Sequence, residues 1–273
     1  MIPAKFDYER AASVEEALAA LANHGDDAKL LAGGHSLLPL MKLRLATPAV
    51  LVDVGRLQDL SYVREEGDDI AIGALTRHRD IETSAVLSAH APLLAFTASL
   101  VGDPQVRHRG TIGGSLAHGD PASDLPAAVL ASDATMVVAG SGGRRNVRAT
   151  EFFKGFLETA VGPDEMLVEI RVPKSSGKGW SYQKFNRRAQ DWAIVGVAYQ
   201  EGAGVALVNV GSTPVRAASV EAALAGGASA EDAAASADDG LYPPSDLNAS
   251  PEYRRHLVRV LTRRAIEEAG TRN

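Results

Sequence analysis

Two short stretches of the sequence combine residue types that can hold a phosphate group without a charged side chain. Residues 32–36 read Ala-Gly-Gly-His-Ser, and residues 111–115 read Thr-Ile-Gly-Gly-Ser. Glycine lets a ligand approach the backbone closely and can adopt a positive φ. Successive N–H groups can then point into one concavity, with Ser and Thr hydroxyls as further donors. The two stretches predict loops that hold a pyrophosphate from both sides; the alternative is that each is only a tight turn at the end of a strand.

The commoner nucleotide motifs are missing, and one catalytic motif is present in degenerate form. Neither glycine pair fits G-x-G-x-x-G, and residues 175–180 (SSGKGW) lack the upstream glycine and the Ser or Thr of a P-loop. Residues 113–117 resemble a nucleophile elbow with Ser115 as the nucleophile, which leaves a serine hydrolase as an alternative. That motif needs a buried strand before it, whereas residues 103–110 are polar and charged.

The sequence contains no pattern typical of a metal site. It has no cysteine, which excludes disulfides, cysteine nucleophiles and iron–sulfur clusters held by thiolates of this chain. His118 and Asp120 lie close together, but no second histidine stands at helical spacing from them. We therefore interpret both as loop side chains and expect no metal.

Asp124 stands at the start of a predicted helix, directly before Leu125 and Pro126. A carboxylate at this position can cap the helix, and proline in the first turn supports that interpretation. The same carboxylate could accept a hydrogen bond from a sugar or ribityl hydroxyl, so the two roles are compatible. The arginines of the last predicted helix are interpreted as an exposed stripe or a partner surface: Arg254, Arg255, Arg259, Arg263 and Arg264.

The composition is typical of a globular protein with a hydrophobic core. Of the 273 residues, 45% are hydrophobic and 23% are charged. The net charge is −6, from 28 basic against 34 acidic residues, and the basic residues are not massed in one block. This argues against nucleic acid as the main partner. The N-terminal stretch lacks the apolar core of a signal peptide, and no window reaches the ~18 apolar residues of a membrane span. We expect a cytoplasmic protein with no integral membrane segment.

The pattern of elements predicts three units. In residues 1–57, a helix begins with the capping-box pair Ser13 and Glu16 and runs to about His24. Short apolar strands are predicted on this helix's C-terminal side, at 28–32 and 49–54. A helix among short strands predicts a small βαβ-type unit.

Residues 58–173 and 174–273 are expected to form the second and third units. In the second, an α/β unit, strands are predicted at 68–76, 134–140 and 166–172, and helices at 79–87, 92–101 and 124–131. In the third, strands at 182–188, 193–200 and 204–211 predict an antiparallel meander, followed by helices at 214–225 and 229–236. A last helix is predicted from its N-cap Ser250 to about Gly270.

At three places the sequence resembles the FAD-binding medium subunits of molybdenum hydroxylases. The stretches are residues 32–46 (AGGHSLLPLMKLRLA), 111–127 (TIGGSLAHGDPASDLPA) and 182–198 (YQKFNRRAQDWAIVGVA). They stand in the family's order, and the resemblance covers nearly the whole chain. Within the family, the sequence is similar to the medium chains of aerobic carbon monoxide dehydrogenases and, more distantly, to the flavin domain of xanthine dehydrogenase.

The resemblance implies an α+β fold. A vanillyl-alcohol-oxidase-like FAD-binding fold of two α/β units is followed by a C-terminal domain with a small antiparallel sheet and helices. FAD is the implied cofactor, and the implied contacts are Ala32, Gly33, Gly34, His35, Ser36, Thr111, Ile112, Gly113, Gly114, Ser115, Asp124, Val168, Lys184, Asp191 and Trp192. Val168, or its neighbour Leu167, stands where the family has an apolar flavin contact. Val101 stands where xanthine dehydrogenases carry an aromatic residue, and it is left out of the expected site.

The resemblance also implies partners. In such complexes a large subunit holds the molybdenum cofactor and a small subunit holds two [2Fe–2S] clusters. The medium subunit takes electrons from the clusters and passes them to an external acceptor, so no side chain of this chain is expected to act as a nucleophile or acid. We expect a dimer of heterotrimers that is associated with the inner face of the membrane through the complex. A stand-alone flavin-dependent oxidoreductase is the alternative.

Overall fold

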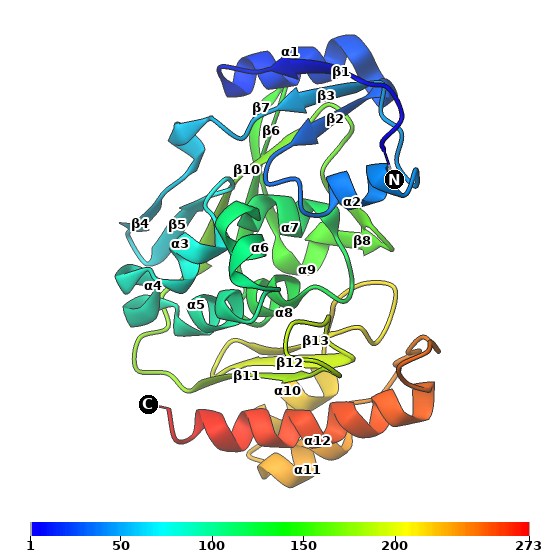
Figure 1. Ribbon diagram of the computed structural model, residues 1–273. Coiled ribbons are helices and arrows are strands. Elements are labelled where there is room, and N and C mark those ends of the chain that lie inside the picture. Colours follow the sequence, from blue (N-terminus) through cyan, green and yellow to red (C-terminus); the bar gives the residue numbers. More distant parts are fainter. Residues whose placement is uncertain (1, 273) are drawn as a thin grey trace.

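A computed structural model describes residues 2–272, and it stacks three main β-sheets along the long axis of the molecule (Figure 1). A small N-terminal sheet and helix α1 lie at one end. A five-stranded sheet with its helices occupies the middle, and a four-stranded sheet covered by the C-terminal helices lies at the other end. The chain therefore passes through three layers in turn.

The N-terminal layer is the predicted βαβ-type unit with one further strand. Its strands are β1 (Asp7–Arg10), β2 (Ala28–Leu31) and β3 (Val50–Asp53), in the order β1-β3-β2, with both pairings parallel. Its helices are α1 (Val14–His24) and α2 (Leu37–Lys42). The Ser13 hydroxyl accepts from the Glu16 N–H at 3.2 Å, which confirms the predicted start of α1. The sequence pattern does not predict β1, because its residues DYER are all exposed and show no apolar alternation.

The middle sheet is antiparallel throughout. Its strands are β4 (Val63–Glu66), β5 (Asp69–Gly73), β6 (Thr135–Gly140), β7 (Gly143–Arg148) and β10 (Met166–Pro173), in the order β4-β5-β10-β6-β7. The three inner strands are confirmed predictions, since they are the apolar ones. The outer strands β4 and β7 are largely charged and exposed, so hydrophobic periodicity does not detect them.

The helices of this layer lie on the side of the sheet that faces the C-terminal layer (Figure 1). They are α3 (His78–Glu82), α4 (Ala85–His90), α5 (Pro92–Ser99), α6 (Pro104–Arg109), α7 (Ile112–His118), α8 (Asp124–Ala131) and α9 (Ala149–Phe152), and a hairpin of β8 (Phe153–Gly155) and β9 (Glu158–Thr159) follows. The single helix predicted at 79–87 is wrong. Ser84 interrupts it, because its hydroxyl accepts from the Leu87 N–H and begins a new helix.

The C-terminal layer is the predicted antiparallel meander with its helices. The strands are β11 (Trp180–Phe185), β12 (Val195–Gln200), β13 (Gly204–Val208) and β14 (Val215–Arg216), and the helices are α10 (Ala218–Ala225), α11 (Ala230–Ala235) and α12 (Pro251–Ala269). One face of this sheet packs against α5 and α8, and the other packs against α12. Its strands therefore reach the middle layer directly.

Arg254 corrects the interpretation of the last helix as an exposed arginine stripe. Its side chain is fully buried, because it shares the apolar helix face of Leu257, Val258 and Leu261. Its Nη2 lies 2.6 Å from Asp246 Oδ2, and its Nη1 donates to two backbone carbonyl groups. The residue thus ties α12 to the rest of the C-terminal layer.

The hydrophobic core does not follow the expected unit boundaries closely. One cluster unites the middle helices, the middle sheet and the inner face of the C-terminal sheet. Another combines the N-terminal layer with residues of β6 and β10. The division into 1–57, 58–173 and 174–273 stays a prediction, in which each unit would hold one of the main sheets.

Candidate functional site

A cleft of about 700 Å³ opens where the three layers meet. This volume lies within the roughly 300–1,000 Å³ typical of small-molecule sites. The residues expected from the sequence that line it are Ala32, Gly33, Gly34, His35, Ser36, Thr111, Gly113, Gly114, Ser115, Asp124, Lys184, Asp191 and Trp192. Segments that are far apart in sequence are thus brought to one place.

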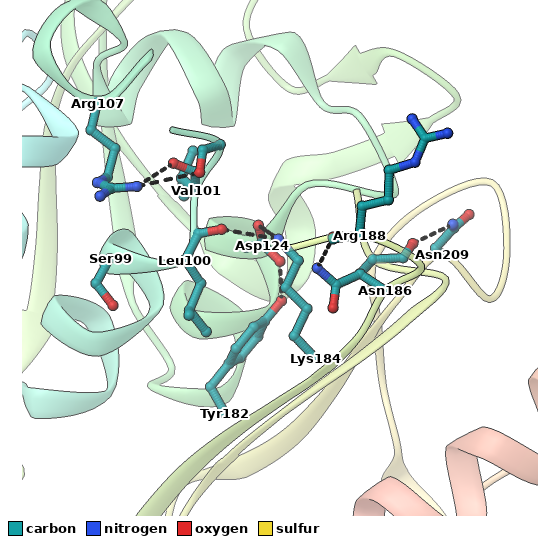
Figure 2. A network of polar contacts seen from close by, with 12 residues as sticks. Ser99, Leu100, Val101, Arg107, Asp124, Tyr182, Lys184, Asn186, Arg188 and Asn209 are labelled. Atoms are coloured by element: carbon teal, nitrogen blue, oxygen red, sulfur yellow. Dashed lines mark hydrogen bonds and ion pairs between the residues drawn. The ribbon is translucent and has the colours of Figure 1, made fainter. Parts of the chain in front are cut away.

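Two expected residues do not line the cleft. Ile112 and Val168 are buried, each in a hydrophobic core cluster. Leu167, the neighbour of Val168, lines the cleft instead, together with Met166, and the pairing of β10 with β6 shifts register between Leu167 and Glu169. Val101, which was left out of the expected site, also lines it. Arg107 Nη1 donates to the Val101 carbonyl oxygen at 3.2 Å and holds this segment in place (Figure 2).

The first glycine motif forms a loop between β2 and α2. Gly34 has a φ of +76°, a conformation that glycine adopts without strain. Within the described residues 2–272, the N–H groups of residues 33–36 find no hydrogen-bond acceptor. Four consecutive unpaired N–H groups beside a cleft are the arrangement that binds an anion through the backbone. This part of the sequence-based hypothesis therefore has a structural counterpart.

The second glycine motif is a helix start, so the expectation of a second loop is wrong. Thr111 caps α7, and its hydroxyl accepts from the Gly114 N–H at 3.1 Å. The N–H groups of Ile112, Gly113 and Ser115 donate to backbone carbonyls. None of these four donors is free, so the motif offers the cleft the hydroxyls of Thr111 and Ser115 rather than a row of backbone N–H groups.

The glycines of both motifs also permit close packing inside the protein. A Cβ on Gly33 would lie 2.3 Å from the Arg109 carbonyl oxygen. A Cβ on Gly113 would lie 2.5 Å from the Cβ of Ala74. A Cβ on Gly114 would lie 2.8 Å from the Thr111 hydroxyl oxygen and 3.9 Å from the Cβ of Ala32. Gly33 and Gly113 are therefore required by packing, whereas a side chain on the exposed Gly114 would press only on the Thr111 hydroxyl.

A short segment before α3 supports both motifs from behind. Arg77 pairs with Thr111 in an isolated antiparallel bridge, and its guanidinium donates to the Arg109 carbonyl oxygen. The His78 N–H donates to the Gly110 carbonyl oxygen at 3.0 Å. These bonds hold the residues before α7 against the first loop.

A buried polar group forms one wall of the cleft (Figure 2). Lys184 Nζ lies 2.8 Å from Asp124 Oδ2 and 3.0 Å from the Leu100 carbonyl oxygen. The Tyr182 hydroxyl donates to Asp124 Oδ1 at 2.7 Å. The expectation that Asp124 caps α8 is wrong, because Ser123 occupies the N-cap position. The Asp124 side chain instead accepts hydrogen bonds from Tyr182 and Lys184 of β11. Burial raises the pKa of Asp124, and Lys184 and Tyr182 oppose that increase by stabilising the carboxylate.

The outer rim is formed by the loop between β11 and β12. Trp192 lines the cleft and is still 56% exposed. Asp191 Oδ2 lies 3.7 Å from the Nε of Arg187 within the same loop. A large aromatic side chain at an open rim provides apolar surface for a ring of a bound ligand.

His78 lines the cleft but carries no sequence signal of its own. It is 3% exposed, and burial lowers its pKa from the ordinary 6.5 to about 4. The residue is therefore neutral near pH 7. Isolated histidines at helix starts are common, and only the fold shows that this one is buried against the cleft.

The geometry does not favour the serine-hydrolase alternative. Ser115 lies within α7, and the element that precedes α7 is helix α6. No strand therefore leads into the serine as a nucleophile elbow requires. No group of three or more His, Asp or Glu side chains within residues 2–272 is arranged to bind a metal ion.

Comparison with known proteins identifies the family. Residues 4–175 match the family described as FAD binding domain in molybdopterin dehydrogenase, and residues 180–269 match the CO dehydrogenase flavoprotein C-terminal domain. The chain belongs to the family of FAD-binding medium subunits of molybdenum hydroxylases. The resemblance seen in three sequence stretches and the α+β fold class are thereby confirmed, as is FAD as the cofactor.

Known medium subunits match this one along their whole length. It is 43% identical to the carbon monoxide dehydrogenase medium chain of Hydrogenophaga pseudoflava, with 100% of this chain and 99% of that one covered. It is 38% identical to the glyceraldehyde dehydrogenase medium chain of Sulfolobus acidocaldarius, with 99% and 100% covered. A solved carbon monoxide dehydrogenase from Hydrogenophaga pseudoflava superimposes with a TM-score of 0.97 at 44% identity, covering 100% and 99% of the chains. The chain is an oxidoreductase flavoprotein subunit.

Proposed function

We propose that the cleft holds FAD and that this subunit carries electrons from [2Fe–2S] clusters of a partner subunit to an external acceptor. The observation that carries the proposal is the row of four unpaired N–H groups at residues 33–36 beside the cleft. A row of consecutive unpaired N–H groups at a partly buried loop is an arrangement that binds an anion. The pyrophosphate of FAD supplies such an anion.

The other lining residues fit the remaining parts of FAD. The hydroxyls of Thr111 and Ser115 are available as donors to the pyrophosphate. The pair of Asp124 and Lys184 offers an acceptor and a donor to polar groups of the flavin or its ribityl chain. Apolar surface for the ring comes from side chains such as Leu167.

FAD, when bound, supplies the redox chemistry, because it can accept electrons one at a time or in pairs. The protein binds and orients it and limits the access of water. Since the chain contains no cysteine and its described residues form no metal-binding group, the electron source lies outside the chain. No nucleophile or acid of this chain is required.

The relatives suggest the partners. We propose a large subunit with the molybdenum cofactor and a small subunit with [2Fe–2S] clusters, arranged as a dimer of heterotrimers. Carbon monoxide dehydrogenase is the proposed type of complex, on the strength of the 43% identity to one of its medium chains. Every helix within residues 2–272 is too short or too polar to span a bilayer. We propose a cytoplasmic complex that contacts the inner face of the membrane.

Stopped-flow spectroscopy tests the electron-transfer role. The purified FAD-loaded chain is mixed with carbon monoxide, purines or N-heterocycles while the flavin absorbance is followed. We expect no change with the chain alone, and bleaching by one of these substrates once the large and small subunits are added.

Two results would overturn the proposal. Bleaching by an organic substrate without partners would make the chain a stand-alone flavin oxidoreductase. Failure of the chain to bind FAD at all would remove the role of the cleft. The Gly114→Val variant should lower FAD affinity, because it adds a branched side chain to a residue that lines the cleft and presses on the Thr111 hydroxyl.

A further inference from the structure

Tyr182 does not line the cleft, but its hydroxyl contacts Asp124, which does. It lies two residues before Lys184 on β11, so both side chains leave the same face of the strand. Lys184 and Asp124 line the cleft, whereas Tyr182 lies behind them and is 3% exposed. Its hydroxyl donates to Asp124 Oδ1, and Lys184 donates to Oδ2 (Figure 2). Each oxygen of the carboxylate therefore has a donor of its own.

The neighbouring strand makes room for this hydroxyl. Gly196 on β12 pairs with Lys184 across the sheet. A Cβ on Gly196 would lie 2.7 Å from the Tyr182 hydroxyl oxygen and 2.6 Å from the Cγ2 of Val208. Any larger residue would displace the phenol. The sheet is thus built to hold the hydroxyl at this place.

We propose that Tyr182 is a positioning residue of the cofactor cleft, whose hydroxyl keeps the Asp124 carboxylate charged and turned toward Lys184. Tyr182 itself does not reach the cleft, so it acts on the cofactor through Asp124. The inference rests on the proposed binding of FAD in this cleft.

The charged groups around Asp124 are few. Lys184 and Tyr182 on β11 oppose the increase in the pKa of Asp124 that burial causes. At the C-terminal end of α5, the carbonyl oxygen of the C-cap residue Leu100 accepts from Lys184. His118 on α7 has a pKa that responds to burial and to Asp120, not to Asp124.

Within residues 2–272, the remaining elements packed against α8 contribute no charge near Asp124. Arg216 on β14 donates to the carbonyl oxygen of Leu130, at the far end of α8. The facing residues of β12 and β13 are apolar, and Glu151 on α9 is exposed. Among residues 2–272, Lys184 and Tyr182 are the two groups that stabilise the carboxylate, and removal of the Tyr182 hydroxyl takes away one of them.

This predicts a change in the pH dependence of FAD binding. Without the hydroxyl, Asp124 becomes protonated at a higher pH and loses its function as an acceptor. A hydrogen bond to a charged group is worth enough to move a pKa by about 1–2 units. In Tyr182→Phe, the fall of FAD affinity on the acid side should therefore begin ~1–2 pH units higher than in the wild type.

The test is a fluorescence titration of FAD with the full chain, from acid to neutral pH. Tyr199→Phe is the matched control, because Tyr199 lies on the adjacent strand β12 and its hydroxyl makes no hydrogen bond within residues 2–272. Gly196→Ala keeps the hydroxyl but displaces it, and it should shift the profile in the same direction. Asp124→Asn removes the titrating group, so adding Tyr182→Phe to it should cause no further shift.

The outcomes separate this inference from the function on which it rests. A wild-type chain that binds no FAD defeats the proposed function. If the wild type binds FAD and Tyr182→Phe weakens it equally at every pH, or leaves it unchanged, Tyr182 is only a core residue. The same conclusion follows if Tyr182→Phe shifts the profile of Asp124→Asn.

Discussion

Replacement of His78 with glutamine should remove part of the acid sensitivity of folding. His78 is 3% exposed, and its Nδ1 has no hydrogen-bond partner within residues 2–272. Burial lowers the pKa of His78 from 6.5 to about 4. The positive charges of His35, Arg107 and Arg77 contribute further to this low pKa. Glutamine has a similar length and cannot take up a proton.

The sign and size of the effect follow from the two pKa values of this residue. The unfolded chain protonates His78 near pH 6.5, whereas the folded chain protonates it only near pH 4. The stability that neutral His78 contributes is thus fully present above its pKa in the unfolded chain. It is lost as the pH falls toward its pKa in the folded chain. At 1.36 kcal/mol per pKa unit, the full loss is roughly 3 kcal/mol, of which about 2 kcal/mol occurs between about pH 7.5 and pH 5.

Urea unfolding of the FAD-free chain at these two pH values measures the loss. We expect the unfolding free energy of the wild type to fall about 2 kcal/mol further than that of His78→Gln. Other titrating groups affect both proteins equally. His108 is exposed, so His108→Gln should retain the wild-type loss. Equal losses in the wild type and His78→Gln would refute the argument that His78 is buried in its neutral form.

Three further predictions concern the cleft. Gly33→Ala should lower the unfolding free energy by about 1–3 kcal/mol in urea, because its Cβ would lie 2.3 Å from the Arg109 carbonyl oxygen. Gly114→Val presses only on the Thr111 hydroxyl, so it should lower the unfolding free energy less and bind FAD more weakly in a fluorescence titration. The reverse pattern would contradict the packing of the two motifs. Lys184→Met leaves the Asp124 carboxylate buried without its cation, so urea unfolding should show a loss of about 3–5 kcal/mol; unchanged stability would mean that water reaches the pair. Acid precipitation should release all of the flavin, since no cysteine is available for a thioether link; flavin in the pellet would indicate a covalent bond.

The polar and glycine-rich part of the cleft could be predicted from sequence because its residues are concentrated in three stretches, whereas the lining contributed by residues 157–167 could not. The loop at 32–36 follows an apolar strand and contains two glycines, and both signals are local. Helix α1 and helix α12 begin at serines that cap them, and a cap involves only residues three apart. The inner strands are apolar, so periodicity detects them. The edge strand β7 is charged and exposed, so hydrophobic periodicity does not detect it.

The residues that sequence reasoning missed depend on distant contacts. Tyr182 interacts with Asp124, 58 positions away in the chain. The charged guanidinium of Arg254 is buried because it donates hydrogen bonds to Asp246 and to two backbone carbonyl groups. His78 is an ordinary histidine in sequence, and its pKa is lowered by burial first and by nearby His35, Arg107 and Arg77 next, all of which depend on the fold. None of these properties can be predicted from the spacing of residues along the sequence.

The sequence by itself determined the family, the cofactor and the stretches that surround it, because these follow from motifs a few residues long. Only the tertiary structure decided how each motif works. Residues 33–36 retain free N–H groups, whereas those of residues 112–115 are occupied by Ala74, Thr76 and Thr111. Whether a donor is free depends on which acceptors the fold brings next to it. That is a property of the packed chain, and two similar glycine motifs therefore have different roles.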